Sequence, residues 1–179
     1  MKLALAQLKT GQNAFQFNSQ ADAWVRELEK TLAEQGVKIV GGLNLQLLLT
    51  KLEPDYYLKG VMQFDVDQIC GRCAETFTLN QMHGFDLGLA HVQTKGRETK
   101  DALSEESEEL DVVYFEGNDV DLAPIVEEQV LLSLPYAPVC RPNCKGICQS
   151  CGSDLNRGQC QCKKTNPLNP FAGLADFKF

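Results

Sequence analysis

Six of the eight cysteines in this chain lie in one stretch, Cys140-Arg-Pro-Asn-Cys144-Lys-Gly-Ile-Cys148-Gln-Ser-Cys151-Gly-Ser-Asp-Leu-Asn-Arg-Gly-Gln-Cys160-Gln-Cys162. The other two form the step Cys70-Gly-Arg-Cys73 far upstream, so every cysteine belongs to a pair or to the cluster. Eight thiolates are enough for two zinc sites of four cysteines each, and a two-residue gap is typical of such sites. We therefore expect the C-terminal stretch to fold around one or two zinc ions.

The spacing of the cysteines suggests how they divide between two sites. In Cys148-Gln-Ser-Cys151-Gly152 the short gap lets both sulfurs face one ion, and Gly152 can adopt the positive φ that turns the backbone around it. The turn-forming run at 156–158 could then bring a second pair back to the first. One predicted site therefore comprises Cys148, Cys151, Cys160 and Cys162. By subtraction, the site that ties the C-terminal module to the body comprises Cys70, Cys73, Cys140 and Cys144.

Disulfides, a redox switch and an iron–sulfur cluster are the alternatives to zinc, and the cellular compartment helps to separate them. The N-terminus has an apolar run of only four residues, broken at Gln7, which falls short of a signal-peptide core of about seven to fifteen residues. The sequence also has no run of about twenty apolar residues that could span a membrane. We therefore expect a cytoplasmic zinc protein with no membrane partner.

Composition supports one domain with a core and a small appendage, because 44% of the 179 residues are apolar. We place the body at residues 1–139 and the cysteine-rich module, with its tail, at 140–179. The formal charge of −7 is uneven: the module carries six basic and two acidic residues, a balance of +4, which leaves −11 on the body. Much of this acidity lies in a predicted loop at about 98–110, which is either a solvated segment or a docking surface for a basic partner.

The basic module suggests a contact with RNA, but the metal must be counted first. A zinc ion with four thiolates carries about −2, so the metal sites offset much of the positive charge. The acidic body also weakens non-specific binding to a phosphate backbone. We therefore predict only a small, local RNA contact, made by Arg141, Lys145, Arg157, Lys163 and Lys164.

Alternating apolar residues predict an antiparallel sheet. After a turn at Gly41-Gly42, one strand places leucines on a single face at 43–49, and the next strand places apolar residues and Gly60 on one face at 58–66. Cys70 to Cys73 would then form a hairpin tip leading into 74–79, with the pattern continuing at 85–89. Shorter strands are expected at 2–8, 14–17 and 112–115.

Two helices are predicted to flank this sheet. Helical spacing of apolar residues indicates a helix at 21–35, capped by Asn18 or Ser19, with Trp24 packed in the core. Asp121 can cap a second helix, which ends at Pro135 and whose apolar side comprises Leu122, Ile125, Val126, Val130 and Leu131. A short final helix could start at 169–170. The predicted fold class is therefore α+β: an antiparallel β-sheet or partly closed barrel with flanking helices and a C-terminal cysteine-rich zinc module.

The sequence gives no sign of an enzyme or of a small-molecule substrate. It has no phosphate-binding Gly-x-x-x-x-Gly-Lys loop, no His-Glu-x-x-His, no Gly-x-Ser-x-Gly and no Gly-x-Gly-x-x-Gly. A zinc ion held by four cysteines lacks the open position that catalysis needs. Thiol oxidoreductases place Cys-x-x-Cys at the start of a helix, whereas both flanks of Cys70 and Cys73 read as strand. His83 and His91 are expected on the surface or in the sheet, without a ligand role.

The second half of the chain resembles a known family, the YceD or large ribosomal RNA subunit accumulation proteins. The resemblance is specific from about Ile69 onwards, and its motifs are Cys70-Gly-Arg-Cys73, the helix at 121–135, Cys144-Lys-Gly-Ile-Cys148-Gln-Ser-Cys151-Gly, Leu155-Asn156, Cys160-Gln-Cys162 and Asn169-Pro-Phe-Ala172. It implies a bacterial or plastid protein needed for accumulation of large-subunit (23S) ribosomal RNA, through its synthesis, processing or assembly. It implies no catalytic activity.

Together these observations predict a non-enzymatic, zinc-stabilised factor that acts by binding. Its expected partner is a ribosomal protein or a large-subunit assembly factor, with ribosomal RNA as a further local contact. The alternative is a redox-sensing zinc or thiol protein, in which oxidation of the cysteines expels the metal and alters partner binding.

Overall fold

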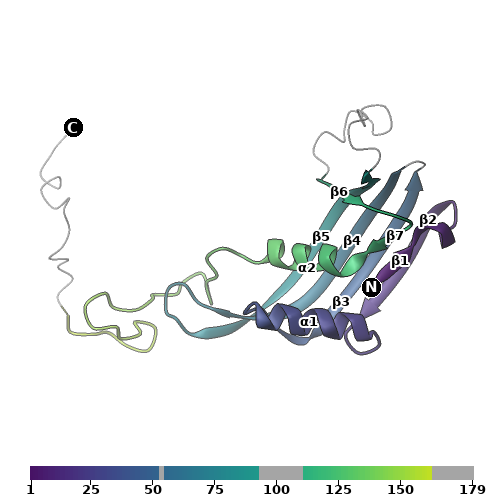
Figure 1. Ribbon diagram of the computed structural model, residues 1–179. Coiled ribbons are helices and arrows are strands. Elements are labelled where there is room, and N and C mark those ends of the chain that lie inside the picture. Colours follow the sequence, from purple (N-terminus) through teal and green to yellow (C-terminus); the bar gives the residue numbers. More distant parts are fainter. Residues whose placement is uncertain (53–54, 93–110, 163–179) are drawn as a thin grey trace, which may run out of the picture.

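A five-stranded sheet with two helices on one face forms the body of the protein (Figure 1). The computed structural model describes residues 1–52, 55–92 and 111–162. The sheet has the order β2-β3-β4-β5-β6, and its strands are β2 (Gly11–Asn18), β3 (Lys38–Leu52), β4 (Asp55–Ile69), β5 (Thr76–His91) and β6 (Asp111–Phe115). The other elements are β1 (Lys2–Ala4), the 3-10 helix η1 (Leu5–Gln7), α1 (Ala23–Glu34), β7 (Asp119–Asp121) and α2 (Leu122–Ser133).

The core lies between the sheet and the helices, on the face that the alternation predicted. The leucines at 43, 45, 47 and 49 of β3 are buried, as are alternate residues of β4 from Leu58 to Val66. Within this face Gly60 lies opposite Phe85 of β5, and a Cβ at Gly60 would lie 2.1 Å from the Phe85 ring. The missing side chain therefore makes room for the aromatic ring.

One expected turn is instead part of a strand. Gly41 and Gly42 have φ of 78° and 99° but interrupt β3 only as a bulge, between Val40 and Asn44. Residues on both sides of the bulge pair with β4, so the long partner strand overrides the local turn signal.

The antiparallel meander covers β2 to β5 but not β6, which pairs parallel to β5. Within the described part of the chain the sheet is open, because its edge strands β2 and β6 are not paired with each other. The prediction offered an antiparallel sheet or a partly closed barrel, and the partly closed barrel is therefore wrong. Short β1 was expected to extend to Leu8, but it ends at Ala4 and pairs with β7 in a separate two-stranded sheet.

Both body helices form close to where the sequence placed them. The N-cap of α1 is Asp22 rather than Asn18 or Ser19, because the Asn18 side chain accepts from the backbone N–H groups of Gln20 and Ala21 in the preceding turn. Trp24 packs edge-on against Phe17 at 5.1 Å, next to the core.

The α2 helix begins as predicted, since the Asp121 side chain accepts from the Ala123 N–H at 3.2 Å. Its buried side includes the four predicted residues from Leu122 to Val130. Leu131 was expected there too, but it is 40% exposed. It lies in the last turn of the helix, where Leu132 is exposed beside it.

The β4–β5 hairpin extends past the helices, and its tip carries the first cysteine pair (Figure 1). The segment after α2 returns to this tip, so residues distant in sequence meet there. Among the residues that the structure describes, no helix has the length and apolar character required to cross a membrane.

Candidate metal centres

The first candidate centre, here called the body site, joins the hairpin tip to the start of the module and comprises Cys70, Cys73, Cys140 and Cys144. All four sulfurs lie within 4.8 Å of one another. The Cys70 and Cys144 sulfurs are 3.9 Å apart, and those of Cys73 and Cys140 are 3.8 Å apart. A sulfur–sulfur bond would be about 2.05 Å long, whereas tetrahedral zinc–sulfur bonds of about 2.3 Å place the sulfurs about 3.8 Å apart.

A tight turn at the hairpin tip aims the first pair of sulfurs at the module. The Cys70 N–H donates to the Glu75 carbonyl and the Ala74 N–H to the Cys70 carbonyl, each at 2.9 Å. Ala74 has a φ of 59° and is the one non-glycine residue with positive φ among those described. Its left-handed conformation closes the turn so that two cysteines separated by two residues face the same point.

The second pair arrives because the chain after α2 docks on this turn. The Gly71 N–H donates to the Pro138 carbonyl at 2.8 Å, which brings Cys140 to the tip. The backbone N–H groups of Arg72 and Cys140 then donate to the Cys70 sulfur, each at 3.4 Å. Three of the four cysteines are at most 5% exposed, and Cys140 is half-buried.

The second candidate centre, here called the knuckle site, lies within the module and comprises Cys148, Cys151, Cys160 and Cys162. Its sulfurs also lie within 4.8 Å of one another. The Gly152 N–H donates to the Cys148 carbonyl at 2.8 Å, and Gly152 has the positive φ expected from the sequence, 72°. In contrast to the body site, none of its four cysteines is buried, and Cys151 is exposed.

Hydrogen bonds and burial shift the pKa values of the body-site thiols in opposite directions. The pKa of the Cys70 thiol is lowered to about 6, mainly because the backbone N–H of Cys140 donates to its sulfur. The N–H groups of Cys73 and Arg72 contribute less. Burial, followed by the neighbouring thiol of Cys70, raises the pKa of Cys140 to about 12.

The knuckle site shows the same division. The N–H groups of Cys151 and Ser150 lower the pKa of the Cys148 thiol to about 6. The Cys151 thiol raises the pKa of Cys162 to about 12. Four sulfurs at this separation repel one another when all are ionised, and a divalent cation among them removes that repulsion. The donor chemistry of both groups therefore fits a thiophilic metal ion, and each group could hold one.

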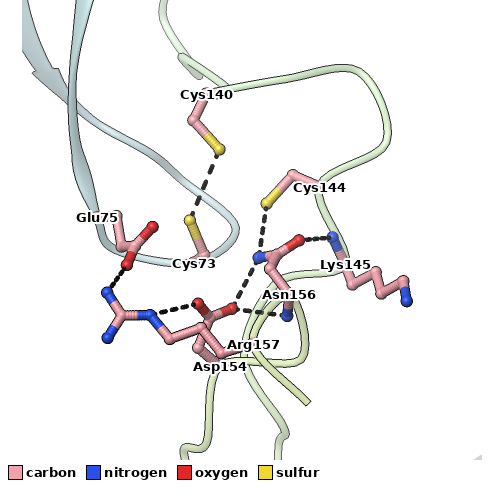
Figure 2. A network of polar contacts seen from close by, with 8 residues as sticks. All are labelled: Cys73, Glu75, Cys140, Cys144, Lys145, Asp154, Asn156 and Arg157. Carbon is pink, nitrogen blue, oxygen red and sulfur yellow. Dashed lines mark hydrogen bonds and ion pairs between the residues drawn. The ribbon is translucent and has the colours of Figure 1, made fainter. Parts of the chain in front are cut away.

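A polar network supports the body site from the side of the module (Figure 2). The Asn156 amide donates to the Cys144 sulfur at 3.5 Å and accepts from the Lys145 N–H at 2.9 Å. Arg157 forms ion pairs with Glu75, beside the hairpin tip, and with Asp154. The sequence marked Asn156 and its neighbour Arg157 as turn residues, Asn156 also as part of a family motif and Arg157 also as a contact to RNA. None of these roles predicted a contact with the body site, because that contact depends on how the module docks.

The structure describes some of the remaining predicted site residues and not others. Arg141 and Lys145 are exposed on the module, and Arg157 is exposed but engaged in its two ion pairs. Lys163, Lys164, the acidic loop at 98–110 and the final helix at 169–170 lie outside the described residues. His83 lies in β5, where its ring nitrogen is 3.3 Å from the Gln129 side-chain oxygen of α2, and His91 ends the same strand.

Comparison with known proteins identifies a family. Residues 58–178 match the family described as large ribosomal RNA subunit accumulation protein YceD. An uncharacterized protein of Mycobacterium leprae is 28% identical over 142 residues, covering 72% of this chain and 59% of the relative. The chloroplastic "Large ribosomal RNA subunit accumulation protein YCED homolog 1" of Zea mays is 25% identical over 140 residues, covering 65% and 48%.

The homolog of the same name in Arabidopsis thaliana is 24% identical over 140 residues, covering 68% of this chain and 44% of the relative. The chain thus spans about half the length of the curated relatives it matches. No solved structure matches significantly.

Proposed function

Because this chain belongs to the YceD family, as its motifs predicted, we propose that it supports the accumulation of large-subunit (23S) ribosomal RNA in the cytoplasm. We propose further that it does so without catalysis, as a zinc-stabilised factor in processing or assembly of that subunit. One observation carries this proposal: the family match at 58–178 includes all eight cysteines and both candidate centres.

Zinc is the metal that we assign to the two centres. Four thiolates at tetrahedral separation are typical of structural zinc, and backbone N–H groups that donate to sulfur favour the thiolate that such a metal needs. When bound, zinc would act as a fixed cross-link at the hairpin tip and within the module. A site closed by four cysteines offers no open position for a substrate, which supports a role in binding rather than in catalysis.

The proposed partner is a ribosomal protein or a large-subunit assembly factor. The acidic body suits a basic protein partner, because the first 139 residues carry −11 of the formal charge. A small RNA contact would come from the exposed Arg141 and Lys145 with the basic residues that follow the knuckle. Arg157 contributes less to it than the sequence suggested, since its charge is offset by Glu75 and Asp154.

Removal of the gene from its host tests the role in RNA accumulation. We expect the ratio of 23S to 16S ribosomal RNA to fall and to recover with the wild-type gene, and an unchanged ratio would contradict the proposal. Sedimentation with large-subunit precursors tests the binding. Reversal of all five basic residues, Arg141, Lys145, Arg157, Lys163 and Lys164, should reduce co-sedimentation. The matched control reverses the exposed Lys30 and Lys59 of the body and should leave it unchanged.

A thiol switch is the second candidate function, and the exposure of the knuckle sulfurs is the observation that favours it. Mild peroxide would oxidise the knuckle cysteines and release zinc. Rapid zinc release together with altered co-sedimentation would favour the switch, whereas zinc retention under peroxide would favour a purely structural role.

A further inference from the structure

The two candidate centres are connected through one short loop. Gly152 to Gln159 joins the two cysteine pairs of the knuckle site, and this loop carries Asn156 and Arg157. Figure 2 shows that Asn156 contacts Cys144 of the body site and that Arg157 contacts Glu75 beside the hairpin tip. The knuckle therefore holds part of the surroundings of the other centre.

Asn156 supports the Cys144 half of the body site. Its amide nitrogen donates to the Cys144 sulfur at 3.5 Å and to the Asp154 carboxylate at 2.7 Å. Its amide oxygen accepts from the Lys145 N–H at 2.9 Å, so both ends of the amide are fixed. An N–H directed at a sulfur stabilises the thiolate, which is the form that binds metal.

Arg157 supports the hairpin half. Its guanidinium pairs with Glu75, the residue whose carbonyl accepts from the Cys70 N–H at 2.9 Å. Asp154 lies 3.5 Å from the Arg157 Nε and also holds Asn156, so one carboxylate joins the two supports. The loop thus contacts both of the segments that build the body site.

Both ends of this loop lie at the knuckle site, next to its cysteines. At its start the Leu155 N–H donates to the Gly146 carbonyl at 2.9 Å, and Asp154 bridges to Ile147. At its end the chain returns to the start of the knuckle, because Cys160 and Cys162 meet the first knuckle pair. A metal ion at the knuckle fixes both ends of the loop, and its loss restores conformational freedom that Asn156 and Arg157 must lose to reach the body site.

We propose that Asn156 and Arg157 are positioning residues through which the knuckle site strengthens metal binding at the body site. This inference rests on the proposed function, since it takes both centres to bind zinc. Loss of a residue that hydrogen-bonds to a metal ligand lowers metal affinity by about 10- to 100-fold, so we expect effects of that size. Binding coupling is reciprocal, so zinc at the body site strengthens the knuckle by the same factor.

The test follows zinc occupancy of the body site in the full chain. Protein is equilibrated in zinc buffers, and alkylation of Cys70 and Cys144 is read by mass spectrometry, because bound zinc protects these thiols. The variants are Asn156→Ala, Arg157→Ala, Glu75→Gln and the knuckle-less pair Cys148→Ser with Cys151→Ser. The matched controls, Asn143→Ala and Gln159→Ala, each remove an exposed amide from the same module.

We expect Asn156→Ala and the knuckle-less pair each to raise the zinc concentration for half-protection about 10- to 100-fold, with the controls unchanged. Combining the two should cost less than the product of the separate factors, because both act through one loop. The coupling would be overturned if the two factors multiplied fully, or if the zinc concentration for half-protection of the body site were unchanged in the knuckle-less protein. Either result would leave the assignment of two zinc sites in place. A wild-type protein without protected thiols at any zinc concentration would overturn the zinc assignment itself. Circular dichroism of each variant confirms that the sheet is folded.

Discussion

The body site and the knuckle site each present four cysteine sulfurs but are built in different ways. The body site joins Cys70 to Cys144, 74 positions apart, and buries three of its cysteines. The knuckle site closes within 148–162 and leaves Cys151 exposed. The difference shows that ligand identity alone does not fix a role: one centre ties two parts of the chain together, whereas the other shapes a single loop.

Removal of each cysteine pair should separate these roles by the largest margin. Cys70→Ser with Cys73→Ser should remove one zinc ion and free the module from the hairpin, with a drop of about 10 °C in Tm, as expected when a tightly bound metal is lost. Cys148→Ser with Cys151→Ser should also remove one zinc ion but lower the Tm by less than half as much. Metal analysis and calorimetry measure both effects. Equal losses of Tm would contradict the comparison.

Thiol reactivity in the metal-free protein should distinguish the two sites by the exposure of their thiolates. Because the pKa of Cys148 is lowered to about 6, its folded state favours the thiolate, and that contribution to stability is present above the unfolded pKa of about 8.5 and is lost as pH falls through about 6. Alkylation of Cys148 should therefore persist at pH 7 and fall near pH 6.

Cys70 has the same lowered pKa but is 1% exposed, so it should react at least about fivefold more slowly than Cys148 at pH 7. Mass spectrometry of the alkylated peptides measures both rates. A body-site thiol that reacts as fast as Cys148 would show that burial does not protect this centre.

A pair of glycines offers the finest comparison. Gly146 and Gly152 have nearly the same φ, 73° and 72°, but a Cβ on Gly146 would lie 2.9 Å from the Arg72 carbonyl oxygen, whereas one on Gly152 would meet nothing within 4 Å. Gly152→Ala should cost about 1 kcal/mol for the left-handed backbone, and Gly146→Ala about 1–2 kcal/mol more because the docked hairpin must shift. Urea unfolding gives both values. Equal costs would mean that the module can move away from Arg72 freely.

The sequence predicted those features that depend on local pattern. Alternation located the buried faces of β3 and β4, Asp121 identified the start of α2, and the cysteine spacing anticipated which sulfurs meet. The assignment of a metal to those sulfurs stays a prediction. Features that depend on tertiary pairing were missed: the bulge at Gly41 and Gly42 and the parallel addition of β6 are decided by partner strands.

The support from Asn156 was missed for the same reason. Its pattern is that of an ordinary turn, and nothing in the local sequence states that the turn lies against Cys144. A docked loop is visible only once both segments of the body site are in place.

The position of the body site also determines how the molecule bears mechanical load. The hairpin that carries Cys70 and Cys73 consists of β4 and β5, which are interior strands of the sheet, paired from Tyr56 and Leu89 to Ile69 and Thr76. The part of a pull on the module that passes through this hairpin, along the strand direction, would therefore act in shear on many backbone hydrogen bonds at once instead of opening them one by one. A partner bound to the module would therefore be connected to the sheet through a stiff hairpin rather than through a flexible joint.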